Sequence, residues 1–139
     1  MVTTVGDGMH SSSYTLTIEV KGHYLHAIVT GLNSVENVVS YLQQLRKECD
    51  ARGCFRVLIE ERLEGPRLRT LDVFQIASQG VVGASRMDAM AFVDVNAEGD
   101  LMKFAETVAA NRGLPMRLFT SVSDARKWLQ RREDGPGPS

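Results

Sequence analysis

The sequence predicts an α/β domain with a single mixed, mostly parallel five-stranded sheet, in the order ββαβαβαβα, and with helices packed against that sheet. One reason is the pattern of apolar residues. Near the start every second residue is apolar, and later short apolar runs alternate with segments in which apolar residues have helical spacing. Strands that alternate with helices are joined by right-handed crossovers and lie parallel. The other reason is size, because 139 residues, 43% of them hydrophobic and 24% charged, suit one domain with its own core.

The first two predicted strands form an antiparallel hairpin at the edge of the sheet. Residues 14–20, YTLTIEV, alternate apolar and polar side chains, which is typical of a strand with one face in water. After the turn KGH, residues 24–31, YLHAIVTG, are more continuously apolar and are expected further inside the sheet. We expect the folded domain to span residues 13–132, between a disordered arm at 1–12 and a disordered tail at 133–139.

The rest of the chain alternates helices with strands. The first helix is expected to begin at Asn33, with Glu36 in the capping-box position, and to end at Gly53. Its apolar stripe consists of Val35, Val38, Val39, Leu42, Leu45 and Cys49. The later strands are expected at 55–60, 90–95 and 116–120, and the later helices at 71–78, at 101–111 and after a cap at Ser121 or Ser123. The last helix should bury Val122, Ala125, Trp128 and Leu129.

The loops that follow the parallel strands form the predicted binding site. Parallel strands bring their carboxyl ends to one edge of the sheet, where α/β proteins bind ligands. The segments expected there are 31–34, 60–70, 94–100 and 120–123, each of which leads into a helix. Because helix N-termini attract negative charge, this edge favours an anion, and Arg67 and Arg69 add positive charge. The alternative is that both arginines lie in solvent on a mobile loop.

Three further residues complete the predicted contact surface. Thr70 is expected to cap the second helix, and its hydroxyl is a candidate for phosphorylation because a phosphate there would meet the helix N-terminus and both arginines. Phe74 lies in a helix that is apolar on more than one side, and is therefore either exposed for a partner or buried on a wide face. Asp94 opens DVNAEGD, which resembles a calcium loop but has Ala105 at the closing acid position, so no metal site is predicted.

Charge and motifs narrow the class of protein. The net charge of -1 gives no general attraction to nucleic acid, and the apolar runs are too short for stable membrane insertion. The sequence patterns of nucleotide-binding loops, hydrolase nucleophiles and zinc proteases do not occur, and no cofactor is expected. The spacing suggests no nucleophile partner for His10, His23 or His26. Cys49 and Cys54 are expected to be reduced packing residues of a cytoplasmic protein.

Residues 91–129, AFVDVNAEGDLMKFAETVAANRGLPMRLFTSVSDARKWL, resemble the C-terminal half of STAS domains, the family of the sporulation anti-sigma-factor antagonists (SpoIIAA-like). The resemblance covers residues 14–130 by element order and the last third of the chain by motif. It implies a mixed sheet packed against helices, related in outline to CRAL-TRIO domains, and a non-catalytic role. In the antagonists, phosphorylation of a Ser or Thr at the start of the second helix controls partner binding. The matching position is near Thr70, where RLRTLDV replaces the usual Asp-Ser-Ser-Gly type of sequence.

Three functional hypotheses follow from the sequence. In the first, a non-catalytic STAS-like domain binds a protein partner or a small ligand around residues 60–76, and a homodimer is one form of such binding. In the second, the protein carries a small apolar or lipid-like molecule between the sheet and the second helix. The lining predicted for that carrier is Phe74, Met87 and Met90. In the third, the protein is an uncharacterised enzyme with a carboxylate base. The bases predicted for that enzyme are Glu60, Glu61 and Asp94.

Overall fold

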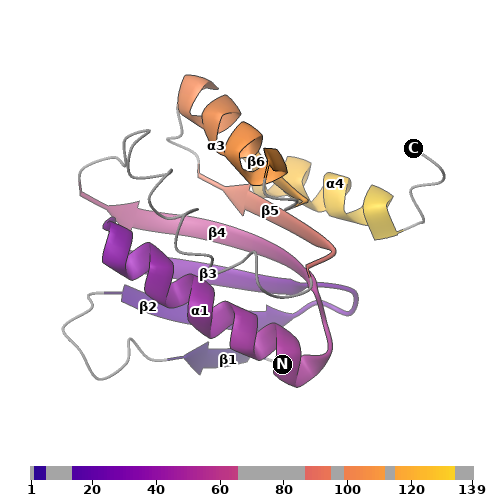
Figure 1. The fold of residues 1–139 in the computed structure, drawn as a ribbon. Coiled ribbons are helices and arrows are strands. Elements are labelled where there is room, and N and C mark those ends of the chain that lie inside the picture. The colour runs from indigo at the N-terminus through magenta and orange to yellow at the C-terminus, as the bar shows by residue number, and fades with distance from the viewer. Residues whose placement is uncertain (1, 6–13, 66–86, 95–98, 112–114, 134–139) are drawn as a thin grey trace.

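The computed structural model contains one mixed sheet with helices on both faces (Figure 1). It describes residues 2–5, 14–65, 87–94, 99–111 and 115–133. The strands of these residues are β1 (Val2–Val5), β2 (Tyr14–Val20), β3 (Leu25–Leu32), β4 (Arg56–Glu64), β5 (Ala89–Val93) and β6 (Met116–Phe119). The helices of the same residues are α1 (Val35–Arg52), α3 (Gly99–Asn111) and α4 (Val122–Glu133). The strands lie in chain order across the sheet; β1, β2 and β3 pair antiparallel, and β3 to β6 pair parallel.

The predicted α/β architecture and its five strands are confirmed, and β1 adds a sixth strand outside β2. β1 pairs antiparallel with β2, with Val2 opposite Glu19 and Val5 opposite Leu16. The prediction of a disordered arm is therefore wrong for β1, and β2 is not the edge of the sheet. The residues of β1 are all β-branched, which suits a strand. A run this short shows no periodicity in the sequence, and the free side of β2 supplies its backbone partners.

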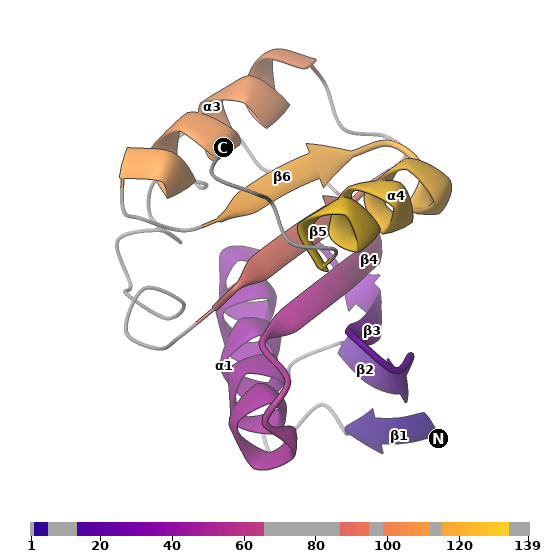
Figure 2. The same ribbon diagram turned by 90° about the vertical axis from the view of Figure 1, so that its right-hand side faces the viewer.

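The sheet has a different helical cover on each face. α1 and α3 lie on one side of the sheet and α4 lies on the other (Figure 2). Between α1 and the sheet is a buried core that includes Leu16, Ile18, Tyr41, Leu45, Val57, Ile59 and Met90. On the other face, Ala125, Trp128 and Leu129 of α4 pack over β4 and β5, which confirms the predicted inner side of the last helix. α4 does not extend over β2 and β3 (Figure 2).

α1 begins one residue later than predicted. Ser34 is the N-cap, with an extended backbone, and its Oγ accepts the N–H of Asn37 at 3.1 Å. The capping box predicted from Asn33 and Glu36 is therefore wrong. The main-chain N–H of Asn33 instead donates to a β4 carbonyl, which joins the start of the helix to the sheet. The predicted end is confirmed, because Gly53 closes the helix in the left-handed region at φ 64.

β4 is longer than the predicted strand FRVLIE. It continues to Glu64 because β3 offers parallel backbone partners as far as Leu32. The predicted strand end at Glu60 is therefore too early, and Glu61 also belongs to the strand. Side chains alternate across a strand, so Glu61 lies on the α1 face while Glu60 and Arg62 lie on the opposite face.

The last helix begins after Ser121, whose Oγ accepts the N–H of Asp124 at 3.1 Å. Of the two predicted caps, the structure therefore selects Ser121. α4 reaches Glu133, one residue into the predicted tail. The predicted second helix, residues 71–78, lies outside the described residues. None of the helices that the structure describes is long and apolar enough to cross a membrane.

Candidate binding surfaces

The four parallel strands end on one side of the molecule, here called the carboxyl edge. Its described residues are Leu32, Asn33, Glu64, Asp94, Phe119 and Thr120. Two main-chain hydrogen bonds join neighbouring strand ends, from Asn33 N–H to the oxygen of Glu64 at 2.7 Å and from Asp94 N–H to the oxygen of Phe119 at 3.0 Å. The predicted convergence of strand ends is therefore confirmed for the part of the edge that the structure describes.

Asp94 is the predicted site residue that the structure places. It follows β5 directly and is half-buried at the carboxyl edge. Because Val93 lies opposite Glu60 in the register of β5 and β4, Asp94 comes next to Glu61. The other predicted site residues, Arg67, Arg69, Thr70 and Phe74, lie outside the described residues. The anion contact and the phosphorylation therefore stay predictions.

Leu32 is a candidate contact residue that sequence reasoning did not single out. It is the last residue of β3, is 52% exposed, and lies opposite Glu64 in the register of β3 and β4. A leucine at the end of an apolar strand reads as a core residue in the sequence. Because Ala27 and Val29 of β3 lie in the core beneath α1, Leu32 lies by alternation on the opposite face, which α4 leaves uncovered at β3 (Figure 2).

A buried tyrosine joins α1 to β4 near this edge. Tyr41 is fully buried, and its hydroxyl donates a hydrogen bond to the carboxylate of Glu61. Burial, followed by the negative charges of Glu61 and Asp94, raises the pKa of Tyr41 well above its usual value of 10.0. The phenol therefore stays neutral and acts as a hydrogen-bond donor. Sequence analysis missed Tyr41 because it assigned the stripe of this helix mainly from aliphatic residues.

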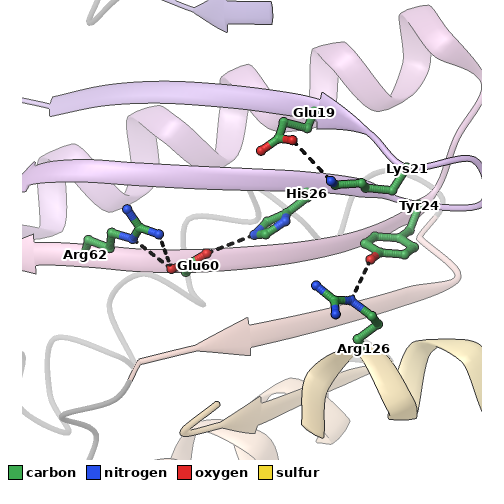
Figure 3. A network of polar contacts seen from close by, with 7 residues as sticks. All are labelled: Glu19, Lys21, Tyr24, His26, Glu60, Arg62 and Arg126. Atoms are coloured by element: carbon green, nitrogen blue, oxygen red, sulfur yellow. Dashed lines mark hydrogen bonds and ion pairs between the residues drawn. The ribbon is translucent and has the colours of Figure 1, made fainter. Parts of the chain in front are cut away.

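The opposite face of β3 and β4 carries a polar cluster of His26, Glu60 and Arg62 (Figure 3). The Nε2 atom of His26 lies 3.0 Å from Oε1 of Glu60, and the Nη2 atom of Arg62 lies 2.7 Å from Oε2. His26 is only 7% exposed, although α4 does not cover it. Spacing along the chain could not indicate this contact, because the two residues lie 34 positions apart and meet through the parallel pairing of their strands.

Further polar contacts lie around this cluster, on the side of β2 and β3 that faces away from α1. Lys21 Nζ lies 3.2 Å from Oε1 of Glu19. Arg126 in α4 donates its Nε–H to the hydroxyl of Tyr24 at 3.2 Å, which joins this helix to the turn between β2 and β3 (Figure 3). Glu19 and Glu60 thus each have a basic partner on this face, Lys21 and Arg62 respectively.

The two cysteines, Cys49 and Cys54, are free thiols. Cys49 belongs to α1 and is buried in the core between this helix and the sheet; burial, followed by nearby negative groups, raises the pKa of its thiol to about 12. A thiol with so high a pKa is inert, which agrees with the packing role predicted for it. Across the residues that the structure describes, no group of three or more His, Cys, Asp and Glu side chains is placed to hold a metal ion.

A solved structure shares the fold of this chain. No protein-family model matches the sequence, and no curated protein matches it. The crystal structure of an uncharacterized protein from the DUF3478 family of Shewanella loihica PV-4, described as having a SpoIIAA-like fold, superposes with a TM-score of 0.52. The match covers 88% of this chain and 99% of that chain at 17% sequence identity, so it bears on the fold alone. The chain therefore has a SpoIIAA-like α/β fold, as its resemblance to STAS domains implied.

Proposed function

We propose that this protein is a non-catalytic STAS-like domain that binds a protein partner at the carboxyl edge of its sheet. The observation that carries the proposal is Leu32, an apolar side chain that is 52% exposed where β3 ends. Contiguous exposed apolar surface rimmed by polar groups is typical of protein-binding sites, and we propose that Leu32 is part of such a surface. The residues proposed for the contact are Leu32, Glu64 and Asp94, together with Arg67, Arg69, Thr70 and Phe74 from the segment after β4.

The described part of this edge also indicates what a partner would present. Glu64 is exposed at the end of β4, and Asp94 is half-buried at the end of β5. A partner that covers Leu32 would bring the exposed carboxylate of Glu64 into an interface, where an unpaired charge is costly. We therefore expect the partner to place an apolar group against Leu32 and a lysine or arginine beside Glu64.

The non-catalytic part of the proposal rests on groups that catalysis would otherwise use. Both carboxylate oxygens of Glu60 are engaged, one by His26 and the other by Arg62, which leaves a poor general base. The phenol of Tyr41 and the thiol of Cys49 have raised pKa values and stay protonated at physiological pH. A nucleophile needs the opposite shift of its pKa.

The pair of variants Leu32→Asp and Val20→Asp tests the proposed contact. Val20 is the matched control because it is also a large apolar residue, 38% exposed, and pairs with Leu25 at the opposite end of β3. Tagged wild-type protein would capture the partner from cells of the source organism, and the affinity of that partner would be measured for all three proteins. We expect Leu32→Asp to weaken binding by about tenfold or more, and Val20→Asp to leave it unchanged. Equal affinity of the two variants would exclude the carboxyl edge as the contact.

Native mass spectrometry of the protein from its own cells separates a protein partner from a small ligand. In the structure, Met90 is 1% exposed within the core beneath α1, and Met87 packs against that core. Both methionines therefore pack as part of the core, which is a common role for methionine. A bound mass the size of a lipid or cofactor, kept by the wild type in the absence of a partner protein, would replace the proposal with the carrier hypothesis.

A further inference from the structure

The two edges of the sheet differ in how they meet further strands. At the β6 edge, the carboxylate of Glu106 in α3 accepts the main-chain N–H of Leu118 at 2.8 Å. The Nε atom of Arg117 lies 3.8 Å from the same carboxylate. A helix side chain thus occupies a main-chain donor of the edge strand, and charged groups stand beside it. These are devices by which proteins prevent pairing with another strand.

The β1 edge has a different character. β1 reads Val-Thr-Thr-Val, without a charged residue, a proline or a glycine. Among the strands of the described residues it pairs with β2 alone, and it forms the end of the sheet farthest from β6 (Figures 1 and 2). An edge strand of β-branched residues with main-chain groups left to pair is a template for a further strand.

The pairing of β2 indicates which residues of β1 direct their main-chain groups outwards. At the turn between β2 and β3, the N–H of Lys21 donates to the oxygen of Tyr24 at 2.9 Å. Hydrogen-bonded pairs alternate along an antiparallel ladder. Every second residue of β2, counted back from Lys21, therefore directs its main-chain groups at β3. Ile18 is not one of these residues, so its main-chain groups point at β1, where it lies opposite Thr3. The residues on either side of Thr3 then direct their own groups away from the sheet.

We propose that β1 pairs with β1 of a second copy of this chain, antiparallel across a two-fold axis at Thr3, so that the two sheets become continuous. In this register the outward main-chain groups of Val2 pair with those of Thr4 in the second copy, and those of Thr4 pair with Val2 in the second copy. These two pairs form about four main-chain hydrogen bonds. A second copy fits because one two-fold axis pairs both free edges at once. β1 also carries no charge that would repel its copy.

The oligomeric state of the full chain tests this dimer, by analytical ultracentrifugation from about 1 to about 200 µM. Thr4→Pro removes an outward donor and leaves the donors that face β2, whereas Thr4→Val keeps the donor and is the control. We expect dimers for the wild type and Thr4→Val. For Thr4→Pro we expect a dimer dissociation constant that is at least about tenfold higher. A wild type that is monomeric throughout, or a Thr4→Pro variant that dimerises like the control, would overturn the proposal.

A second measurement keeps the test valid if proline disturbs β1 itself. Opposed residues of a non-hydrogen-bonded pair have Cα atoms about 4.5 Å apart, within the range of a disulfide. In a Cys54→Ser background, Thr3→Cys is therefore expected to cross-link two copies on oxidation, and Val5→Cys is not. A dimer with no cross-link at Thr3, or with equal cross-linking of both variants, would overturn it. The dimer is independent of the proposed partner contact, so Leu32→Asp should leave it intact.

Discussion

The side chains of His26 and Glu60 meet across β3 and β4, with Nε2 and Oε1 3.0 Å apart, on the face of the sheet that α4 leaves uncovered. Their side chains are 9% and 16% exposed, so each is held largely out of water. A buried polar group that loses its partner costs free energy. Each member of the pair therefore depends on the other, and Arg62 holds the remaining carboxylate oxygen.

Glu60→Ala should lower the free energy of unfolding by about 2 kcal/mol, because it leaves His26 and Arg62 without their acceptor. Urea unfolding followed by circular dichroism measures this change. The matched control is Glu64→Ala, an exposed glutamate at the end of the same strand, which should change the stability by less than about 0.5 kcal/mol. Equal effects of the two substitutions would show that the cluster does not stabilise the fold.

Tyr41→Phe should destabilise the protein by about 2 kcal/mol, because it removes the buried hydroxyl that donates to the carboxylate of Glu61. Tyr24→Phe is the control, since its hydroxyl accepts from Arg126, an exposed side chain that regains water when the contact is lost. The loss there should be about 0.5 kcal/mol. Chemical denaturation of both variants measures the difference, and a larger loss for Tyr24→Phe would contradict the assignment.

The buried thiol of Cys49 predicts a loss of stability at alkaline pH. Its pKa is raised from 9.0 to about 12 by burial, so in that interval the unfolded chain releases a proton that the folded chain keeps. Stability contributed by this difference is complete below pH 9 and falls as the pH rises towards 12. Cys49→Ala should flatten the fall in the free energy of unfolding between these values, and Cys54→Ala should not. An identical pH dependence for wild type and Cys49→Ala would contradict the prediction.

The N-cap of α1 can be tested by two substitutions at one position. Ser34→Ala removes the oxygen that accepts the N–H of Asn37 and should cost about 1 kcal/mol. Ser34→Asp restores an acceptor at the helix N-terminus and should recover most of that loss. Thermal and urea unfolding provide the measurement. No loss for Ser34→Ala would mean that the cap lies elsewhere, as the sequence prediction at Asn33 had it.

Elements with a strong local signal were predicted well from the sequence. β2 has the predicted bounds because its apolar and polar residues alternate, and the apolar ones from Tyr14 to Ile18 are buried. The inner face of α4 was predicted because Ala125, Trp128 and Leu129 follow helical spacing. Gly53 was recognised as a helix end because a left-handed cap favours glycine. Each of these signals lies within a few residues of the feature that it indicates.

The predictions that failed concern contacts between distant segments. The end of β4 was placed too early, because the polar run from Glu60 to Glu64 reads as a loop until β3 supplies parallel partners. The cap of α1 was misplaced because the main chain of Asn33 is bonded to β4, outside its own helix. Of the candidate site, Asp94 was predicted correctly at the carboxyl edge, whereas Leu32 was missed because exposure at a strand end has no local signature.

The sequence by itself determined the order of the described strands and helices from Tyr14 onwards, the apolar faces that build the core, and the absence of several catalytic sequence patterns. These properties depend on local spacing and composition, which a single chain displays directly. The tertiary structure alone decided that β1 pairs with β2 as the end strand of the sheet, that Tyr41 meets Glu61, and that His26 meets Glu60. Such contacts depend on strand register and on the angle at which α1 crosses the sheet. Both are set by the packing of the whole core, and no short stretch of sequence encodes them.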